Sequence, residues 1–274
     1  MNKLDLSEVK FSRRDKNFGI KIPSKLSADL AYEIGFHIGD GHLTITKRKD
    51  TGVSMFHIVF SGNWKEEKDF YKNTIVPLIF KIYNKKPHMR MEHKNTIRLY
   101  FNSKAVALFK SKVLGLPTGN KKGRVSIPKL ILNSSPRMKA SCLGGIIDSD
   151  FCLSFKKDGR YPNLSASFPL ECKKLVNNIK SILKGIGITC SICIENRNDV
   201  RRNPMFYKAY RIDINGKENL RKKVRYISFR NPIHFTKLLL WEKTGRCLPN
   251  TTLKHRIKSI ASVAQFGRAF AWTI

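Results

Sequence analysis

The hydrophobic positions of the chain follow a helical period and a strand period in turn. Within residues 22–45, the spacing of Ala31, Ile34 and Ile38 predicts a helix that Ser27 or Asp29 can cap. A strand pattern starts directly after this helix, and a second strand is predicted over residues 54–62. A helix over 63–83, a hairpin over 87–103 and a helix over 104–115 follow. The first half of the chain therefore predicts one αββαββα unit.

The second half repeats the same order of elements. Residues 135–155 hold a helix pattern with Pro136 near its first turn, followed by the start of a strand. A strand over 161–168, a helix over 170–187, a hairpin over 188–216 and a helix over 217–228 complete the unit. We therefore predict an α+β protein of tandem αββαββα repeats, with the boundaries that follow. They are an N-terminal extension (1–20), a first repeat (21–134), a second repeat (135–246) and a C-terminal tail (247–274).

The tail differs in pattern from the repeats. Its helix-like basic pattern ends after residue 260. We expect truncation after about Lys258 to leave the function of the repeats intact.

The charge of the chain narrows the possible partners. Lys and Arg number 53 against 20 Asp and Glu, which gives a formal charge of +33. Such a chain would repel itself unless a polyanion neutralised it, so nucleic acid is the expected partner. No apolar signal core and no stretch of transmembrane length is present, so we expect no membrane partner and an intracellular, cytoplasmic protein.

Two carboxylates stand at corresponding places in a chain that has few of them. The motif EIGFHIGDG ends one predicted helix, and the motif LGGIIDSDF ends its counterpart. Paired glycines in each motif remove side-chain bulk, so the two helices can approach backbone to backbone and bring Asp40 and Asp150 together. Two carboxylates at carbonyl-bearing helix ends repel each other unless oxygen-seeking cations lie between them. Asp148 has no acidic counterpart, because Ile38 takes its place, and is predicted to be structural.

The two motifs, together with GLPTGNKKGRVSIPKLILNSS in the chain between them, resemble the LAGLIDADG homing endonucleases of the single-chain, two-motif type. The resemblance implies a pseudo-twofold monomer with two saddle-like antiparallel sheets along the major groove and paired motif helices at the centre. It also implies an intron-encoded, site-specific DNA endonuclease that uses Mg²⁺, with Mn²⁺ as an alternative. Asp40 and Asp150, with Gly39 and Ser149 before them, match the metal-binding positions.

The sequence departs from the family pattern near the expected site. Glu33 stands where the first motif has leucine, and Phe151 stands where the second has its terminal glycine. Gly62 and Phe168 lie near the places where the family often has a glutamine, and only the neighbouring Asn63 could substitute for one. The catalytic lysine also has several candidates, which are Lys121 or Lys122 in the first repeat and His234 or Lys237 in the second.

Basic side chains on the predicted strands and hairpin tips are the candidate DNA contacts. They are Lys47, Lys49, His57, Arg90, Arg98, Lys156, Lys157, Arg197, Arg201, Arg202 and Arg211. The departures leave two functions open. The first is a metal-dependent endonuclease acting on double-stranded DNA. The second is a non-cleaving protein of the same fold, either an RNA-splicing maturase, for which RNA would be the partner, or a DNA-binding regulator.

Overall fold

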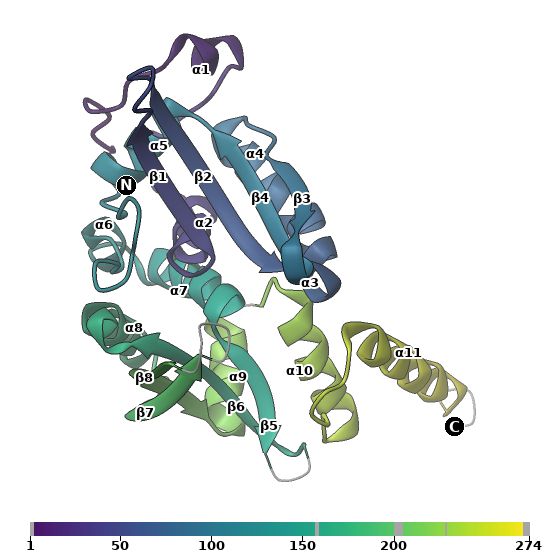
Figure 1. Cartoon of the computed structure of the whole chain (residues 1–274). Helices are drawn as coiled ribbons and strands as arrows, with labels where there is room; N and C mark the ends of the chain where they lie inside the picture. The colour runs from purple at the N-terminus through teal and green to yellow at the C-terminus, as the bar shows by residue number, and fades with distance from the viewer. Residues whose placement is uncertain (1–2, 157–158, 200–204, 228, 271–274) are drawn as a thin grey trace.

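The computed structural model describes residues 3–156, 159–199, 205–227 and 229–270, and the side chains within them except those of 198, 199, 205 and 263–270. The first repeat follows the predicted order (Figure 1). Its elements are α2 (Ala28–Gly39), β1 (Gly41–Lys47), β2 (Ser54–Asn63), α3 (Trp64–Phe70), the π-helix η1 (Tyr71–Ile75), α4 (Val76–Tyr83), β3 (His88–Glu92), η2 (His93–Asn95), β4 (Thr96–Asn102), α5 (Lys104–Leu108) and the π-helix η3 (Phe109–Val113).

The second repeat has the same order. Its elements are α7 (Pro136–Asp150), β5 (Cys152–Lys156), β6 (Tyr161–Pro169), η4 (Leu170–Cys172), α8 (Lys173–Gly185), β7 (Ser191–Asp199), β8 (Met205–Asn215) and α9 (Lys217–Tyr226). In the described part of the chain, four further helices lie outside this pattern. They are α1 (Arg13–Asn17), α6 (Lys129–Leu132), α10 (Pro232–Thr244) and α11 (Leu253–Phe270).

Each repeat builds one four-stranded antiparallel sheet, and the two sheets have equivalent strand orders. The first runs β1-β2-β4-β3 and the second β5-β6-β8-β7. In the register, Gly41 pairs with Phe60 and Cys152 pairs with Ser165. The predicted α+β fold of two αββαββα repeats is therefore confirmed.

In each sheet one face is apolar and packs on helices, while the other is open. In the first sheet, alternate residues such as Ile58, Phe60 and Leu99 are fully buried. Leu164 and Ile212 are buried in the same way in the second sheet. Figure 1 shows α3 and α4 behind the first sheet, whose front face carries no helix. Both open faces are therefore available to an extended ligand, which can contact each sheet along the whole length of its strands.

Helices α2 and α7 join the two repeats at the centre of the molecule, and glycine determines how closely they pack. A Cβ atom on Gly35 would lie 1.9 Å from the carbonyl oxygen of Cys142, and one on Gly145 would lie 2.1 Å from that of Tyr32. The backbones therefore touch where the motif glycines are, as predicted. Gly144 differs from the expectation, because a Cβ atom added there would lie 3.3 Å from the Ile227 side chain of the second repeat and would not meet the backbone of α2.

Asp148 connects the helix pair to the chain that leads into α10. Its Oδ2 accepts hydrogen bonds from the hydroxyl of Tyr32 on α2 and from the backbone N–H of Arg230, both at 2.8 Å. The Asn231 side chain donates to the carbonyl of Asp148 at 3.1 Å. The structural role predicted for Asp148 across the helix pair is confirmed.

The departure at Glu33 is explained by a buried ion pair. Its Oε1 lies 2.5 Å from Nζ of Lys110, and its Oε2 accepts a hydrogen bond from Tyr83 at 3.0 Å. All three residues are buried. A carboxylate is tolerated in this helix because both of its oxygens have partners.

The expectation that the helical pattern ends after residue 260 is wrong. α11 continues to Phe270 and packs on α10 (Figure 1). Arg256 of α11 is buried, and its guanidinium donates to Oγ1 of Thr236 on α10 at 3.0 Å and to the carbonyl of Thr251. Residues 253–256 are therefore part of a packed helix. Among the described residues, no helix combines the length and apolar character needed to cross a bilayer.

The close helix contact gives a stability prediction. Gly35→Ala places a methyl group against backbone that cannot move aside, so it should lower the free energy of unfolding by about 3 kcal/mol. The control is Gly185→Ala, because an added Cβ there meets no atom within 4 Å. Urea denaturation of both variants measures the difference, and equal stabilities would contradict the close contact.

Candidate active site at the helix ends

The last residues of α2 and α7 face each other. A Cβ atom on Gly39 would lie 1.9 Å from the Ser149 hydroxyl oxygen and 2.9 Å from Oδ2 of Asp150. Asp40 follows Gly39 directly, and the negative charge of Asp150 acts on its carboxyl group. The structure therefore brings Asp40, Asp150, Gly39 and Ser149 together, as the sequence predicts. The Ser149 hydroxyl itself donates to its own helix, with the Gly145 carbonyl at 3.0 Å.

Lys121 comes from the segment of the first repeat between η3 and α6 and inserts into the same place. Its ammonium group donates to the carbonyl oxygens of Ile38 at 2.8 Å and Gly41 at 3.0 Å, and also to that of Gly39. Burial lowers the pKa of Lys121, while the charges of Asp150 and Asp40 act in the opposite direction. This cation lies where the helix-end carbonyls and the two carboxylates concentrate negative potential.

Asp40 is half-buried and has two further polar neighbours. Its Oδ2 accepts a hydrogen bond from the Tyr71 hydroxyl at 3.0 Å. Burial raises the pKa of Asp40 well above its usual value, and the charges of Asp150 and Glu67 raise it further. The hydrogen bond from Tyr71 and the charge of Lys121 oppose this shift. The carboxyl group is thus held by the protein but disfavoured as an anion in the absence of a cation.

Asp150 lies in a cavity of about 530 Å³ between the repeats. The cavity is lined by Gly39, Lys121, Lys122 and Phe168, among others. The side chain is exposed to solvent through this opening, yet the surrounding protein atoms raise its pKa to about 6, and Lys121 opposes the shift. Among the described residues, no side chain donates a hydrogen bond to the Asp150 carboxylate. The two acids therefore occupy unequal environments.

The donors present suit a hard divalent cation. Two carboxylates and the helix-end carbonyls supply oxygen only, which is the ligand type that Mg²⁺ and Mn²⁺ prefer. Within the described ranges, no group of three or more His, Cys, Asp or Glu side chains is placed to enclose a metal. Mg²⁺ commonly binds proteins through one or two carboxylates and takes its remaining ligands from phosphate and water. The residues fit a site that substrate oxygens complete.

Other candidates from the sequence lie elsewhere. Lys122 lines the cavity and pairs with Glu171 at 2.9 Å. Lys237 donates to the Leu153 carbonyl at 2.9 Å and does not line the cavity, while His234 is buried against Phe229. A catalytic role for Lys122 or Lys237 remains a prediction.

The polar neighbours of the site differ from the expected replacement for the family's glutamine. The Asn63 side chain caps α3, accepting from the backbone N–H groups of Lys65 and Glu66, so it is not free to serve Asp40. Phe168 is buried against Phe151, as a side chain without polar atoms would be. Tyr71 and Glu67 are the site neighbours that the sequence analysis missed. The available signal was Gly62, since glycine inside a strand marks a close approach.

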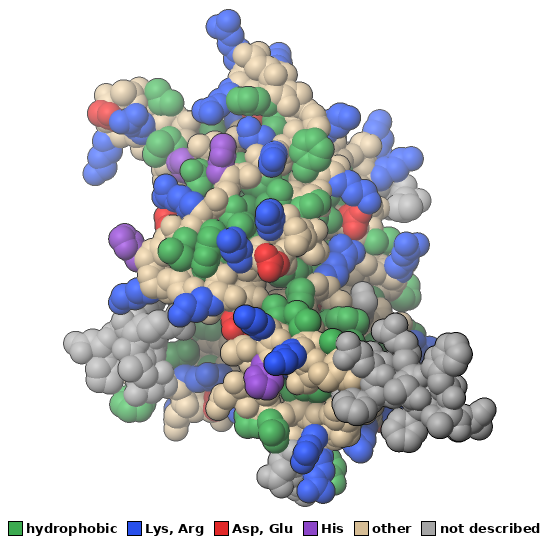
Figure 2. All heavy atoms as spheres, turned by 90° about the vertical axis from the view of Figure 1, so that its right-hand side faces the viewer, with side chains coloured by type: hydrophobic (Ala, Val, Ile, Leu, Met, Phe, Trp, Pro, Cys, Tyr) green, Lys and Arg blue, Asp and Glu red, His purple; other side chains and the backbone are tan. Residues whose placement is uncertain are grey.

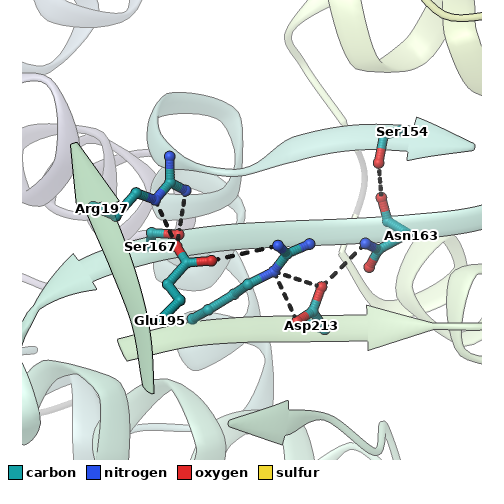
Figure 3. A network of polar contacts seen from close by, with 7 residues as sticks. Ser154, Asn163, Ser167, Glu195, Arg197 and Asp213 are labelled. Atoms are coloured by element: carbon teal, nitrogen blue, oxygen red, sulfur yellow. Dashed lines mark hydrogen bonds and ion pairs between the residues drawn. The ribbon is translucent and has the colours of Figure 1, made fainter. Parts of the chain in front are cut away.

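The open face of the second sheet carries a network of acids and arginines (Figure 3). Glu195 on β7 accepts hydrogen bonds from Arg197 at 2.6 Å and Ser167 at 2.5 Å, and pairs with Arg211 at 3.4 Å. Arg211 also pairs with Asp213 at 2.9 Å. Asp213 in turn accepts a hydrogen bond from Asn163 at 3.0 Å. The two arginines are therefore held in fixed positions before any ligand binds.

The first sheet repeats this arrangement on its own edge strand. Glu92 pairs with Arg90 at 2.9 Å and with Arg98 at 3.1 Å, and both guanidinium groups lie over the ring of Tyr100. His57 contacts Asn102 at 2.7 Å. Lys47, Lys49 and Lys156 are exposed, whereas Lys157, Arg201 and Arg202 lie outside the described residues. Figure 2 shows Lys and Arg spread over one face of the molecule, with few acidic side chains among them.

Solved structures share this architecture. Mesophilic variants of the homing endonuclease I-DmoI align over 73% of this chain and 95% of theirs, at 18% identity and a TM-score of 0.51. An I-DmoI variant in complex with its target DNA and Mn aligns over 73% and 95%, at 19% identity and a TM-score of 0.52. Another, in complex with its target DNA and Mg, aligns over 73% and 95%, at 18% identity and a TM-score of 0.51.

The chain has the fold of the LAGLIDADG homing endonucleases. No family model and no curated protein matches its sequence. The LAGLIDADG fold thus persists here at sequence identities of 18% and 19%.

The raised pKa of Asp150 gives a prediction for the metal-free protein. Because the folded-state pKa of about 6 lies above the usual value of 3.8, folding favours the protonated carboxyl. Its stabilising contribution is complete below the unfolded pKa and is lost as the pH rises through about 6. Wild-type protein should therefore become less stable relative to Asp150→Asn between about pH 4 and about pH 7, with no further change at higher pH. Urea denaturation in EDTA measures this, and a stability difference that does not vary with pH would contradict the shift.

Proposed function

We propose that the protein is a divalent-metal-dependent, site-specific endonuclease acting on double-stranded DNA. The observation that carries this proposal is the meeting of Asp40 and Asp150 at the ends of two touching helices, between two open sheets. The similar structures include I-DmoI variants bound to target DNA with Mn or Mg, which supports the same partner and the same ions here. The proposal has three further parts. The protein functions inside the cell, it is encoded by an intron, and it acts as a monomer.

The residues of the site have separable roles. Asp40 and Asp150, with the Gly39 and Ser149 carbonyls, would hold Mg²⁺ or Mn²⁺ against the scissile phosphates. When bound, the cation supplies the Lewis acidity that activates water and stabilises charge on the leaving 3′ oxygen. Lys121 fixes the end of α2 through its three carbonyl contacts and offsets part of the carboxylate charge. The open sheet faces position the duplex, because a β-ribbon fits the major groove.

The acid pair is tested by isosteric substitution. Asp40→Asn and Asp150→Asn should each abolish double-strand cleavage of a plasmid library that carries randomised sites, because the oxygen ligand charge is lost. DNA affinity should remain close to that of the wild type, since the sheets are unchanged. Ca²⁺, which is larger and more loosely held than Mg²⁺, should support binding without efficient cleavage. Mg²⁺-dependent cleavage by the double variant would rule out this pair as the active site.

The basic surface is tested by salt. If the sheets follow duplex phosphates, the logarithm of affinity should fall linearly with the logarithm of salt concentration, by roughly 0.9 per contact over about ten contacts. Fluorescence anisotropy with labelled duplex measures the slope. A nearly flat dependence would exclude nucleic acid as the partner.

The arginine network is tested at Glu195. Glu195→Gln removes the charged partner of Arg197 and leaves Arg211 paired with Asp213 alone, so nonspecific DNA binding should strengthen while discrimination among sites falls by roughly tenfold. Glu218→Gln is the matched control, because Glu218 pairs with Lys222 on α9, away from the open face. Site selection from a random duplex library compares the two variants. Equal effects would show that only net charge matters.

A maturase or regulator remains the second candidate, and one observation favours it. Phe168 lies near the place where the family often has glutamine, so this position of β6 carries an aromatic ring and no polar group. A protein that binds RNA or DNA without cutting would not need that group. Specific binding to structured RNA, with no DNA cleavage in Mg²⁺ or Mn²⁺, would favour this second candidate.

A further inference from the structure

Tyr71 makes a specific contact with only one of the two carboxylates. Its hydroxyl lies 3.0 Å from Oδ2 of Asp40 and 2.8 Å from the carbonyl oxygen of Ser61 on β2. The side chain is fully buried. Its ring packs edge-on against Phe36 of α2, with 5.6 Å between the centroids. The hydroxyl therefore reaches the site from a fixed ring.

Two local features allow this reach. Gly62 lies beside the tyrosine ring, and a Cβ atom there would stand 2.6 Å from Cε2 and 2.8 Å from the hydroxyl oxygen of Tyr71. Any side chain at position 62 would displace the ring. Tyr71 is also the first residue of the π-helix η1 between α3 and α4, and such segments often re-aim a side chain at functional sites. The strand and the helix are thus both shaped to admit this residue.

The contact has no counterpart among the described residues of the second repeat. The strand register places Phe168 where the first repeat has Gly62, so an aromatic ring fills the space that glycine leaves open in the first repeat. Among the described side chains, none donates a hydrogen bond to Asp150. One carboxylate is therefore oriented by a protein hydrogen-bond donor, and the other has no such donor among the described side chains.

We propose that Tyr71 is a positioning residue for Asp40, admitted by Gly62, and that it serves the hydrolysis of one DNA strand only. The hydrogen bond occupies Oδ2 and leaves Oδ1 available to a cation. Outer partners of this kind fix the geometry of a ligating carboxylate. The assignment rests on the proposed endonuclease function and adds an asymmetry that the acid pair alone does not require.

The test compares Tyr71→Phe with Tyr83→Phe on duplexes labelled separately on each strand. Tyr83 is the matched control, since its buried hydroxyl also donates to a carboxylate, Glu33, outside the site. Tyr71→Phe should slow cleavage of one strand roughly tenfold to a hundredfold and leave the other unchanged, so nicked product accumulates. The strand whose cleavage is slowed should be the same strand whose cleavage Asp40→Asn reduces most. Tyr83→Phe should leave both strand rates unchanged.

A second measurement does not depend on cleavage. Electron paramagnetic resonance measures the Mn²⁺ ions bound to the protein–DNA complex. Tyr71→Phe should lower the affinity for one of these ions by a similar factor, and Tyr83→Phe should lower the affinity for none. Gly62→Ala should reproduce the Tyr71→Phe pattern in both measurements, because it displaces the ring. Thermal unfolding of each variant confirms that the fold is retained.

The outcomes separate this proposal from the proposed function. If the wild type binds Mn²⁺ with DNA but cuts neither strand, the endonuclease function fails, and ion binding by Tyr71→Phe alone decides the role of Tyr71. Three results would overturn the proposed role of Tyr71. They are unchanged Mn²⁺ binding by Tyr71→Phe, equal slowing of cleavage of both strands, and an equal effect of Tyr83→Phe. A wild-type complex that binds no Mn²⁺ would also overturn it.

Discussion

The contact between the backbones of α2 and α7 is the constraint on which the rest of the structure depends. Helices with ordinary side chains pack about 8–10 Å apart, and the added bulk would separate their C-terminal ends. Here Gly35 and Gly145 remove that bulk, so the last residues of the two helices touch at Gly39 and Ser149. The two carboxylates, the cavity beside them and the relative placement of the two sheets all follow from this contact.

Much of the fold could be predicted because it is encoded in local patterns that occur twice. The period of the apolar residues indicates the elements, and their repetition indicates the topology. The helix end at Phe270 was missed because the apolar and basic spacing weakens there and Gly267 is unfavourable in a helix, although a single glycine costs only about 1 kcal/mol. Packing of Arg256 against α10 is a tertiary contribution that no local pattern contains.

The site was only partly predictable, for a physical reason. Asp40 and Asp150 are found from motifs at helix ends, and Lys121 is found from the segment that lies between these two motifs. Tyr71 comes from a helix register that a π-helix shifts, and it acts through the absence of a side chain at Gly62. Sequence patterns indicate which side chains are present. They rarely indicate that a glycine leaves space for the side chain of another residue. Similarly, the pairing of Glu92 with Arg98 and of Glu195 with Arg211 depends on strand register, which the sequence does not show directly.

Lys121 has a consequence for how the two repeats are related. It lies in the last part of the first repeat, between η3 and α6, and it contacts the end of the first motif helix while its charge acts on the acid of the second. The segment that carries Lys121 therefore contributes a side chain to the candidate active site in addition to linking the two motif helices. A chain built from two copies of either half would lack this asymmetric insertion, so the two halves are not interchangeable. An exchange of repeats between such proteins therefore has to keep the segment that carries Lys121 together with the first half.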